Sequence, residues 1–335
     1  MAKVAILGAG SWGTALALVL SDNGHEVTVW SIAEAEIEML KNEHEHKDKL
    51  PGVILPDSMI FTTDLKFACQ DKELIVMAVP SVYTRSTSQL ASPYISKGQI
   101  IVDVAKGVEE DTLMTLSQII EEEIPQAEVA VMSGPSHAEE VGRRLPTTIV
   151  VGSRNKETAQ AVQNLFMNDV FRVYVSPDVL GIELGGALKN VVALAAGMAD
   201  GLGYGDNTKA ALITRGISEI SRLGVEMGGK AETFAGLTGI GDLVVTCSSV
   251  HSRNRKAGVL IGQGKSMQEA MDEVQMVVEG VYSAKAAYAL AKKYNVEVPI
   301  IAGVNRILFD DFSAKDAVVE LMKREKKGEY STLEW

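Results

Sequence analysis

The sequence predicts an α/β protein in which a doubly wound, mainly parallel sheet precedes an all-α C-terminal domain. Up to about residue 175, six apolar β-rich runs alternate with helical stretches, as is typical of a parallel sheet covered by helices on both faces. From about Ser176 the chain is rich in Ala, Leu and Gly with helical periodicity, and no β-rich run of comparable strength follows. We therefore expect a first domain at residues 1–177 and a helical second domain at residues 178–335.

Six expected strands lie in the first half of the chain, and the long expected helices lie in the second half. The runs predicted to form strands are KVAILGAG, EVTVW, ELIVMAVP, QIIVDVAKG, EVAVMSGP and TTIVVGS. The second half contains the helical patterns VLGIELGGALKNVVALAAGMADGL and VYSAKAAYALAKKYNV. Between the halves, Ser176 to Asp178 predict a helix start, because Pro has a suitable fixed φ and Ser is a good N-cap.

Composition and charge narrow the classes of partner and location. The 335 residues are 46% hydrophobic with a formal net charge of −12, so most of the surface repels phosphate backbones and nucleic acid is not an expected partner. An anionic small ligand therefore needs a locally basic pocket. The chain enters a strand pattern directly after Met1 without a secretory leader, and its most apolar long stretch, Val191 to Met198, is soon broken by Asp200. We expect a cytoplasmic protein without a membrane span.

Cysteines and histidines give little support for a metal site. Cys69 and Cys247 are far apart in the sequence and lack C-x-x-C spacing, so both are expected to act as small hydrophobic residues. His44 and His46, in the run KNEHEHKDK, have side chains that can bind metals. A solvated loop is the better-supported prediction for this run, and we expect no bound metal.

A glycine motif near the N-terminus predicts a dinucleotide site. Gly8, Gly10 and Gly13 form G-x-G-x-x-G between a buried strand and a helical pattern. In a Rossmann-type turn the first glycine permits the tight turn, the second lets a pyrophosphate approach the backbone, and the third allows close packing of helix on strand. The amides of the helix N-terminus face the anion. A glycine-rich turn without a ligand is the alternative, which the strand-turn-helix context disfavours.

The choice between NAD and NADP stays open. An NAD site commonly has Asp or Glu at the end of the second strand, and an NADP site has an Arg there. Here Trp30 is followed by SIAEAE, with neither residue at the tip. Glu34 or Glu36 could reach a ribose hydroxyl, but both also suit the solvated first turn of a helix.

Two predicted strand ends carry candidate ligand-binding residues. Lys106 directly follows a strand and adjoins a glycine, and parallel sheets bind ligands beyond the carboxyl ends of their strands. Gly134, Ser136 and Ala138 occupy an equivalent loop. Within that loop His137 suits either a catalytic base or a capping-region histidine without catalytic duty.

Lys189 and Asn190 interrupt a helix that is otherwise apolar or small on nearly every side. Burial of an unpaired lysine is costly, and a desolvated lysine has a pKa lowered from about 10.4 towards about 7 to 8, where it can exchange protons with a substrate oxygen. Lys189 is our candidate proton donor and acceptor. The alternative is a lysine whose stem packs on the helix while its ammonium group reaches solvent.

A glycine-punctuated loop with Asp242 precedes the polar run Ser252, Arg253 and Asn254. Arginine beside backbone amides suits bidentate recognition of phosphate or carboxylate. A solvated helix start is the alternative for this run.

Six segments together resemble the bacterial NAD(P)-dependent glycerol-3-phosphate dehydrogenases. They are GAGSWGTALA, AKGVE, SGPSHAEEV, ELGGALKNVVALAAGMADGLGYGDNTKAALITRG, TFAGLTGIGDLVVTC and SRNRKAG, in family order over nearly the whole chain. The resemblance implies reversible hydride transfer between a nicotinamide, NAD or NADP, and C2 of glycerol 3-phosphate. The reaction normally runs as reduction of dihydroxyacetone phosphate, for phospholipid synthesis.

The resemblance also implies residue roles. Lys189 matches the general acid/base, while Lys106 and Asp242 match polar groups around the reacting oxygen. Arg253 and Asn254 match the phosphate clamp. The implied substrate-binding set is Lys106, Gly134, Ser136, Lys189, Asn190, Asp242, Ser252, Arg253 and Asn254. The implied cofactor-binding set is Gly8, Gly10, Ser11, Trp12, Gly13, Lys106, Ala138, Arg253, Val277 and Glu279, the last two on the nicotinamide side.

The chain departs from the family pattern after the second predicted strand. Many members carry Arg or His where this chain has Ile32 or Ala33, and such basic side chains suit a 2′-phosphate. NADP preference is therefore an open question.

Three further alternatives remain open at this point. One is a two-domain dehydrogenase of a different hydroxy acid, and another is a nicotinamide-sensing binding protein without chemistry. The third concerns the helical faces rich in Ala and Gly, which suit either packing within the domain or the surface of a homodimer.

Overall fold

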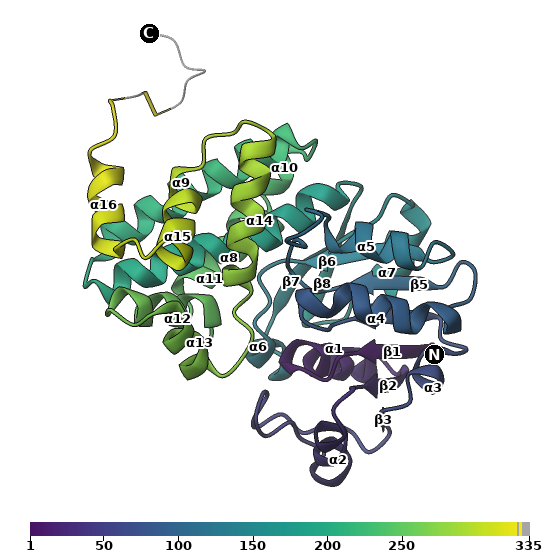
Figure 1. Cartoon of the computed structure of the whole chain (residues 1–335). Helices are drawn as coiled ribbons and strands as arrows, with labels where there is room; N and C mark the ends of the chain where they lie inside the picture. Colours follow the sequence, from purple (N-terminus) through teal and green to yellow (C-terminus); the bar gives the residue numbers. More distant parts are fainter. Residues whose placement is uncertain (327, 330–335) are drawn as a thin grey trace.

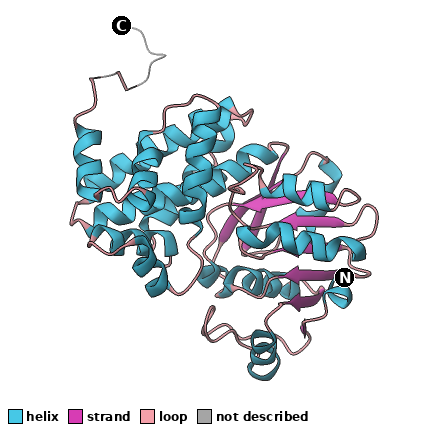
Figure 2. Cartoon of the chain, in the orientation of Figure 1, coloured by secondary structure: helices cyan, strands magenta, loops and turns pink. Residues whose placement is uncertain are grey.

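The computed structural model describes residues 1–326, 328 and 329, and consists of a half that contains a sheet and a half made of helices (Figures 1 and 2). The sheet forms from the chain up to Ser176. From Val179 onward, the described residues form helices and connecting loops. The predicted order of an α/β half followed by an all-α half is confirmed.

One eight-stranded sheet has the order β3-β2-β1-β4-β5-β6-β7-β8. Neighbours from β3 to β6 are parallel, β7 pairs with β6 in the antiparallel direction, and β8 runs parallel to β7. The prediction of a mainly parallel sheet is therefore confirmed, with the last two strands reversed. The strands are β1 (Lys3–Leu7), β2 (Glu26–Trp30), β3 (Ile60–Thr62), β4 (Leu74–Met77), β5 (Ile100–Asp103), β6 (Glu128–Ser133), β7 (Thr147–Gly152) and β8 (Phe171–Ser176).

All six predicted runs form strands, and two further strands, β3 and β8, lie outside those runs. Strand β3 has only three residues, too few for a recognisable pattern. Strand β8 lies at the sheet edge with alternating buried and exposed residues at its start, so it lacks the continuous apolar run that marks a strand buried on both faces.

Helices cover both faces of the sheet because its central strands are apolar on both sides. In β1, Val4 and Ile6 belong to one core cluster, whereas Ala5 and Leu7 belong to another on the opposite face. The helices of this half are α1 (Ser11–Asp22), α2 (Glu34–Glu43), α3 (Leu65–Cys69), α4 (Thr84–Ala91), α5 (Leu116–Glu123), α6 (Ala138–Gly142) and α7 (Lys156–Phe166). The sheet is thus doubly wound.

The second half is built around the long helix α8, which other helices surround (Figure 1). Residues 181–199 of α8 are all buried. Its helices are α8 (Val179–Gly201), α9 (Asp206–Glu226), α10 (Ala231–Phe234), α11 (Asp242–Ser248), α12 (Arg253–Gly262), α13 (Met267–Val274), α14 (Glu279–Lys293), α15 (Pro299–Phe309) and α16 (Ala314–Met322). A π-helical turn, Leu237–Gly241, directly precedes α11.

Small residues let α8 and α12 approach closely. A Cβ atom on Gly197 would lie 2.9 Å from the Cα of Gly258, and one on Gly201 would lie 3.0 Å from the Cα of Gly262. These glycines therefore serve packing within the helical half, which is the first of the two alternatives given for its Ala- and Gly-rich faces.

Helix α8 is apolar over a longer range than the stretch Val191 to Met198 that stands out in the sequence. By length and composition it could cross a membrane, and a bent pair, Ala231–Ser248 with Arg253–Gly262, passes the same test. However, 78% of the apolar window in α8 is buried inside the fold. Core packing accounts for its hydrophobicity.

Two local expectations were wrong. The N-cap of α8 is Asp178, whose carboxylate accepts a hydrogen bond from the Gly181 amide, and not Ser176. His46 is buried and hydrogen-bonded to Glu36, so the run around it is not simply a solvated loop. A carboxylate ten residues away in sequence explains its burial.

Candidate functional site

A cleft of about 1120 Å³ lies between the carboxyl ends of the strands and the helical half. Most residues singled out in the sequence line it: Gly8, Gly10, Ser11, Trp12, Lys106, Ser136, Ala138, Lys189, Asn190, Asp242, Ser252, Arg253, Asn254, Val277 and Glu279. Gly13 and Gly134 do not line it. The structure therefore gathers residues from both halves of the chain at one site.

The glycine turn between β1 and α1 has the geometry of a dinucleotide cradle. Gly8 has φ +118°, and a Cβ there would lie 2.7 Å from the backbone of Ala78. A Cβ on Gly13 would overlap the Gly8 carbonyl oxygen, whereas one on Gly10 would meet no atom within 4 Å. The first and third glycines are thus required by the turn itself, and the second leaves open space towards the cleft, as a pyrophosphate needs.

The N-terminus of α1 also suits an anion. Gly10 is the N-cap without a side-chain hydrogen bond, and no acidic residue lies in the first turn of the helix. Backbone amides and the positive end of the helix dipole are therefore directed at the cleft. Together with the open space at Gly10, this end of the cleft fits the pyrophosphate of a nicotinamide dinucleotide.

A charged cluster that no sequence pattern predicts lies at the end of β2. The Glu36 carboxylate accepts hydrogen bonds from Ser31 Oγ at 2.5 Å, His46 Nε2 at 2.9 Å and Lys49 Nζ at 2.5 Å. Burial opposes its ionisation, but His46, Lys49 and Ser31 lower the pKa of Glu36 to about 2. The alternative that Glu36 is a solvated carboxylate in the first turn of a helix is therefore wrong, whereas Glu34 is exposed as that alternative predicts.

At the other end of the cleft, one carboxylate joins the two predicted lysines. Lys189 Nζ lies 2.9 Å from Asp242 Oδ1, and Lys106 Nζ lies 2.6 Å from Asp242 Oδ2. Lys189 also donates to Thr246 Oγ1 at 2.6 Å, and Lys106 donates to the Gly134 carbonyl oxygen at 3.1 Å. The Lys189 side chain is only 7% exposed, so the alternative in which its ammonium group reaches bulk solvent is wrong.

Burial and charge set the proton affinities in this group. Desolvation lowers the pKa of Lys189 to about 8, with Lys106 acting in the same direction and Asp242 opposing it. Burial alone would raise the pKa of Asp242, but Lys106 and Lys189 lower it, so the carboxylate is ionised. A lysine with a pKa near 8 can give up or take a proton close to neutral pH.

The chain places these groups through close helix contacts. Lys189 and Asn190 lie in mid-helix on α8, and Asp242 begins α11 directly after the π-helical turn. A Cβ on Gly185 would lie 2.5 Å from the Thr238 carbonyl oxygen of that turn. The glycine therefore lets the turn pack against α8 and brings Asp242 to Lys189. Such π turns are frequent at functional sites.

The run Ser252 to Asn254 begins α12 at the cleft. Ser252 is its N-cap and accepts from the Arg255 amide. Asn254 Nδ2 donates to Asn190 Oδ1 at 2.9 Å, while its Oδ1 accepts from the Gly280 amide at 2.8 Å. Ser252 and Asn254 are buried, which contradicts a fully solvated helix start. Arg253 lines the cleft, and burial lowers its pKa.

Glu279 connects the two halves across the cleft. Its carboxylate accepts hydrogen bonds from the amide of Ser81, at 3.1 Å, and from the Ser81 hydroxyl. Burial raises its pKa, although Ser81 and Arg253 oppose this shift. Ser81 was missed in the sequence, because nothing local marks a partner 198 residues away.

His137 occupies the capping position that one of its two alternatives predicted. It is the N-cap of α6, but its side chain makes no capping hydrogen bond. Its ring lies 5.9 Å from the ring of His251, and both residues line the cleft. Desolvation and then the nearby Lys189 lower its pKa, so it is neutral at neutral pH.

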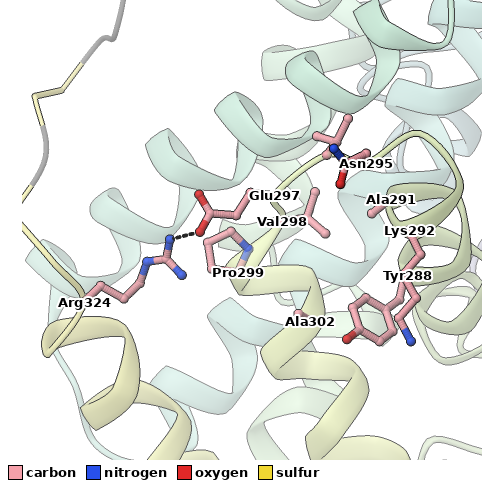
Figure 3. Close-up of a pocket in the computed structure, with 10 residues that line it drawn as sticks. Tyr288, Ala291, Lys292, Asn295, Glu297, Val298, Pro299, Ala302 and Arg324 are labelled. Carbon is pink, nitrogen blue, oxygen red and sulfur yellow. Dashed lines mark hydrogen bonds and ion pairs between the residues drawn. The ribbon is translucent and has the colours of Figure 1, made fainter.

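A second hollow, of about 390 Å³, lies where α14 turns into α15 (Figure 3). Glu297 forms an ion pair with Arg324 at its edge, as the dashed line shows. None of the candidate site residues lines it. The hollow therefore belongs to the packing of the helical half and is not a candidate for the reaction site.

The described residues were compared with the ligand sets of metal sites, and the two cysteines with reactive thiols. Within residues 1–326, 328 and 329, no group of three or more His, Cys, Asp or Glu side chains is placed to hold a metal ion. Cys69 and Cys247 are buried and free, and burial raises the pKa of each thiol to about 12. Both behave as hydrophobic residues.

Comparison with known proteins identifies similar chains over the full length. Residues 3–159 match the family model for the N-terminus of NAD-dependent glycerol-3-phosphate dehydrogenase, and residues 178–319 match the model for its C-terminus. An Agathobacter rectalis protein named glycerol-3-phosphate dehydrogenase (NAD(P)+) is 69% identical over 335 residues, covering 100% of both chains. A Bacillus subtilis protein of the same name is 53% identical, covering 99% of this chain and 97% of its own.

A solved structure is similar over the same extent. The crystal structure of glycerol-3-phosphate dehydrogenase from Coxiella burnetii has a TM-score of 0.93 and 38% identity to this chain. The match covers 96% of this chain and 99% of the other.

Proposed function

Since the chain belongs to the NAD-dependent glycerol-3-phosphate dehydrogenase family, we propose that it reduces dihydroxyacetone phosphate reversibly to glycerol 3-phosphate. The observation that carries the proposal is that one cleft holds the glycine turn at one end and the Lys189–Asp242–Lys106 group at the other. A nicotinamide bound along this cleft supplies the hydride that is transferred to C2 of the substrate.

We assign most of cofactor binding to residues 1–177 and most of substrate binding to residues 178–335. Gly8, Gly10 and Gly13 support a pyrophosphate, with Ser11 and Trp12 beside it on the first turn of α1. The remaining proposed contacts of either NAD or NADP come from Lys106, Ala138, Arg253, Val277 and Glu279, all of which line the cleft.

The substrate phosphate is assigned to Arg253 and Asn254 at the start of α12, with Ser252 beside them. Arginine can make two parallel hydrogen bonds to phosphate oxygens, and the first amides of α12 add donors for an anion. Ser136, in the loop after β6, completes the proposed direct substrate contacts, and Gly134 contributes through its carbonyl oxygen, which accepts a hydrogen bond from Lys106. This arrangement supplies the local positive charge that an acidic protein needs for an anionic substrate.

Lys189 acts as the general acid in reduction. As negative charge develops on the C2 oxygen, its ammonium group donates the proton, and Lys106 adds positive charge that stabilises the same oxygen. Asp242 holds both ammonium groups in position through its two oxygens. In the reverse direction, neutral Lys189 takes the proton from the hydroxyl of glycerol 3-phosphate. Asn190, next to Lys189, accepts a hydrogen bond from Asn254 and so connects the lysine to the proposed phosphate site.

The cellular setting follows from this activity. Glycerol 3-phosphate is the backbone precursor of phospholipids, and we assign the protein to the cytoplasm, where no membrane or nucleic-acid partner is needed. All the site residues proposed here come from one chain, so the activity does not require the homodimer that the helical faces would also allow.

The test is the initial rate of oxidation of NADH and NADPH, at matched concentrations, with dihydroxyacetone phosphate as substrate. The proposal predicts turnover with at least one nucleotide. Turnover of ketopantoate or another oxo acid, with none of the triose phosphate, would instead support a hydroxy-acid dehydrogenase. Nucleotide binding without turnover of any substrate would support the sensing protein.

A further inference from the structure

The cleft contains a charged cluster that the reaction described above does not use. Glu36, in the first turn of α2, lies just beyond the end of β2 and lines the cleft together with Ser31 and Lys49. Its carboxylate side chain is only 12% exposed, whereas the Lys49 side chain is 40% exposed. The carboxylate is therefore held inside, and the lysine that pairs with it remains partly open to the cleft.

The position of this cluster is that of the adenosine ribose. Strands β1 and β2 are parallel neighbours, and the Gly8 amide donates to the Trp30 carbonyl oxygen at 2.9 Å. The glycine turn and Ser31 therefore lie side by side at the same edge of the sheet. In dinucleotide sites the residues after the second strand face the ribose 2′ position, which is a hydroxyl in NAD and a phosphate in NADP. This step depends on the proposed function.

The charges at this position are nearly balanced. Ile32 and Ala33 at the tip carry no charge, and Ile32 is 78% exposed. Of the cations that line the described cleft, Lys106, Lys189 and Arg253 belong to the substrate end, which leaves Lys49 at the ribose end. Its ammonium group is 2.5 Å from a Glu36 oxygen, so the carboxylate offsets the charge that a phosphate would meet.

We propose that Glu36 sets the nucleotide preference of this protein by pairing with Lys49. Lys49 is the cation for the 2′-phosphate of NADP, and Glu36 weakens this interaction enough for NAD to compete. The arrangement differs from an arginine placed directly at the strand end, because here the cation comes from a loop 13 residues after the carboxylate that restrains it. Glu36 is a specificity-determining residue that acts through Lys49.

Two substitutions with opposite effects test the proposal. Glu36→Gln keeps the shape and an acceptor for Ser31 but removes the charge that offsets Lys49, so affinity for NADPH relative to NADH should rise roughly tenfold. Lys49→Met keeps the side-chain length but removes the cation, so the same ratio should fall roughly tenfold. Matched controls are Glu38→Gln on the same helix and Lys47→Met in the same loop, both exposed and outside the cleft lining.

The first readout is binding, by titration calorimetry of the full chain and its variants with NADPH and NADH. Adenosine 2′,5′-bisphosphate and 5′-AMP are titrated as well, because they differ only in the 2′-phosphate. The second readout is the ratio of kcat/KM for the two nucleotides with dihydroxyacetone phosphate. Unchanged thermal unfolding of Glu36→Gln would show that the cluster tolerates the substitution.

The outcomes separate this inference from the proposed function. Opposite shifts in the binding ratio for the two variants, with unchanged ratios in the controls, would support the inference. Ratios for Glu36→Gln and Lys49→Met that match wild type would overturn it, whatever the catalytic activity. Absence of triose phosphate turnover in wild type would overturn the proposed function, while the calorimetric ratios would still decide the role of Glu36.

Discussion

The two ends of the cleft are built from different parts of the chain. The cofactor end is formed mainly by backbone atoms. Gly8 and Gly13 are required by the geometry of the turn, Gly10 leaves open space, and the amides of α1 face the cleft. At the substrate end, the site is side chain: two lysines share a buried carboxylate contributed by a helix more than 50 residues after Lys189. Backbone geometry can be specified by a short motif, whereas a buried charge group depends on tertiary packing.

The comparison implies that the two ends can be damaged separately. A substitution of Lys189 should affect proton transfer while leaving dinucleotide affinity intact, and a substitution of Arg253, which is also assigned a cofactor contact, should weaken substrate binding more than dinucleotide binding. A substitution at the cofactor end should do the reverse. Substitutions at Lys189, Arg253 and Gly10 test that separation.

Lys189→Met should have the largest effect on catalysis. It removes the proton donor and leaves Asp242 with one lysine, so kcat for reduction of dihydroxyacetone phosphate should fall about 10³-fold or more. The dissociation constant for the reduced nucleotide, followed by tryptophan fluorescence, should stay within about threefold of wild type. The exposed Lys256→Met on α12 is the control and should retain full activity. A Lys189→Met variant with most of its kcat would exclude this lysine as the acid.

Arg253→Ala should mainly weaken substrate binding. Loss of a desolvated arginine–phosphate pair costs about 2 to 5 kcal/mol, so KM for dihydroxyacetone phosphate should rise by about 30-fold or more. The kcat at saturating substrate should change much less than in Lys189→Met. Unchanged KM would show that the phosphate is held elsewhere, and Arg253→Lys should recover part of the loss because it restores the charge without the bidentate geometry.

Gly10→Val should damage the cofactor end without damaging the fold. Space around Gly10 is open and its φ of −65° suits any residue, so thermal unfolding should match wild type. The added side chain fills the pyrophosphate space, and nucleotide affinity should fall by about tenfold or more. The matched comparison is Gly13→Ala, whose Cβ overlaps the Gly8 carbonyl oxygen and should therefore lower the unfolding temperature. Equal stability of both variants would contradict the different roles given to these glycines.

The sequence was informative where a local pattern determines the structure. Six strands were apolar on both faces and could be predicted from continuous runs, whereas β8 alternates at the sheet edge and β3 has three residues. Likewise the glycine turn is predicted from the spacing of Gly8, Gly10 and Gly13 together with the strand before it and the helical pattern after it. Lys189 was identified as a polar residue in an apolar helix, but only the structure shows that its partner is Asp242.

Other features could not be predicted because the partners are distant in sequence. One example is the cluster at the end of β2, whose members lie in a polar stretch with the pattern of a solvated segment. In the structure, the Glu36 carboxylate accepts hydrogen bonds from Ser31, His46 and Lys49. The hydrogen bonds from Ser81 to Glu279 link residues 198 positions apart. Residue types alone contain no signal for such pairings, which arise when helices and loops pack around the sheet.

The role of Lys189 in proton transfer is tested by the pH dependence of kcat/KM for the substrate in both directions. Lys189 has a pKa of about 8 and must be protonated for reduction, so reduction of dihydroxyacetone phosphate should lose rate as pH rises through about 8. Oxidation of glycerol 3-phosphate needs the neutral amine and should gain rate over the same interval. Opposite profiles with a shared midpoint near 8 would support Lys189 as the proton donor and acceptor. Profiles that stay flat between pH 7 and 9 in both directions would contradict it.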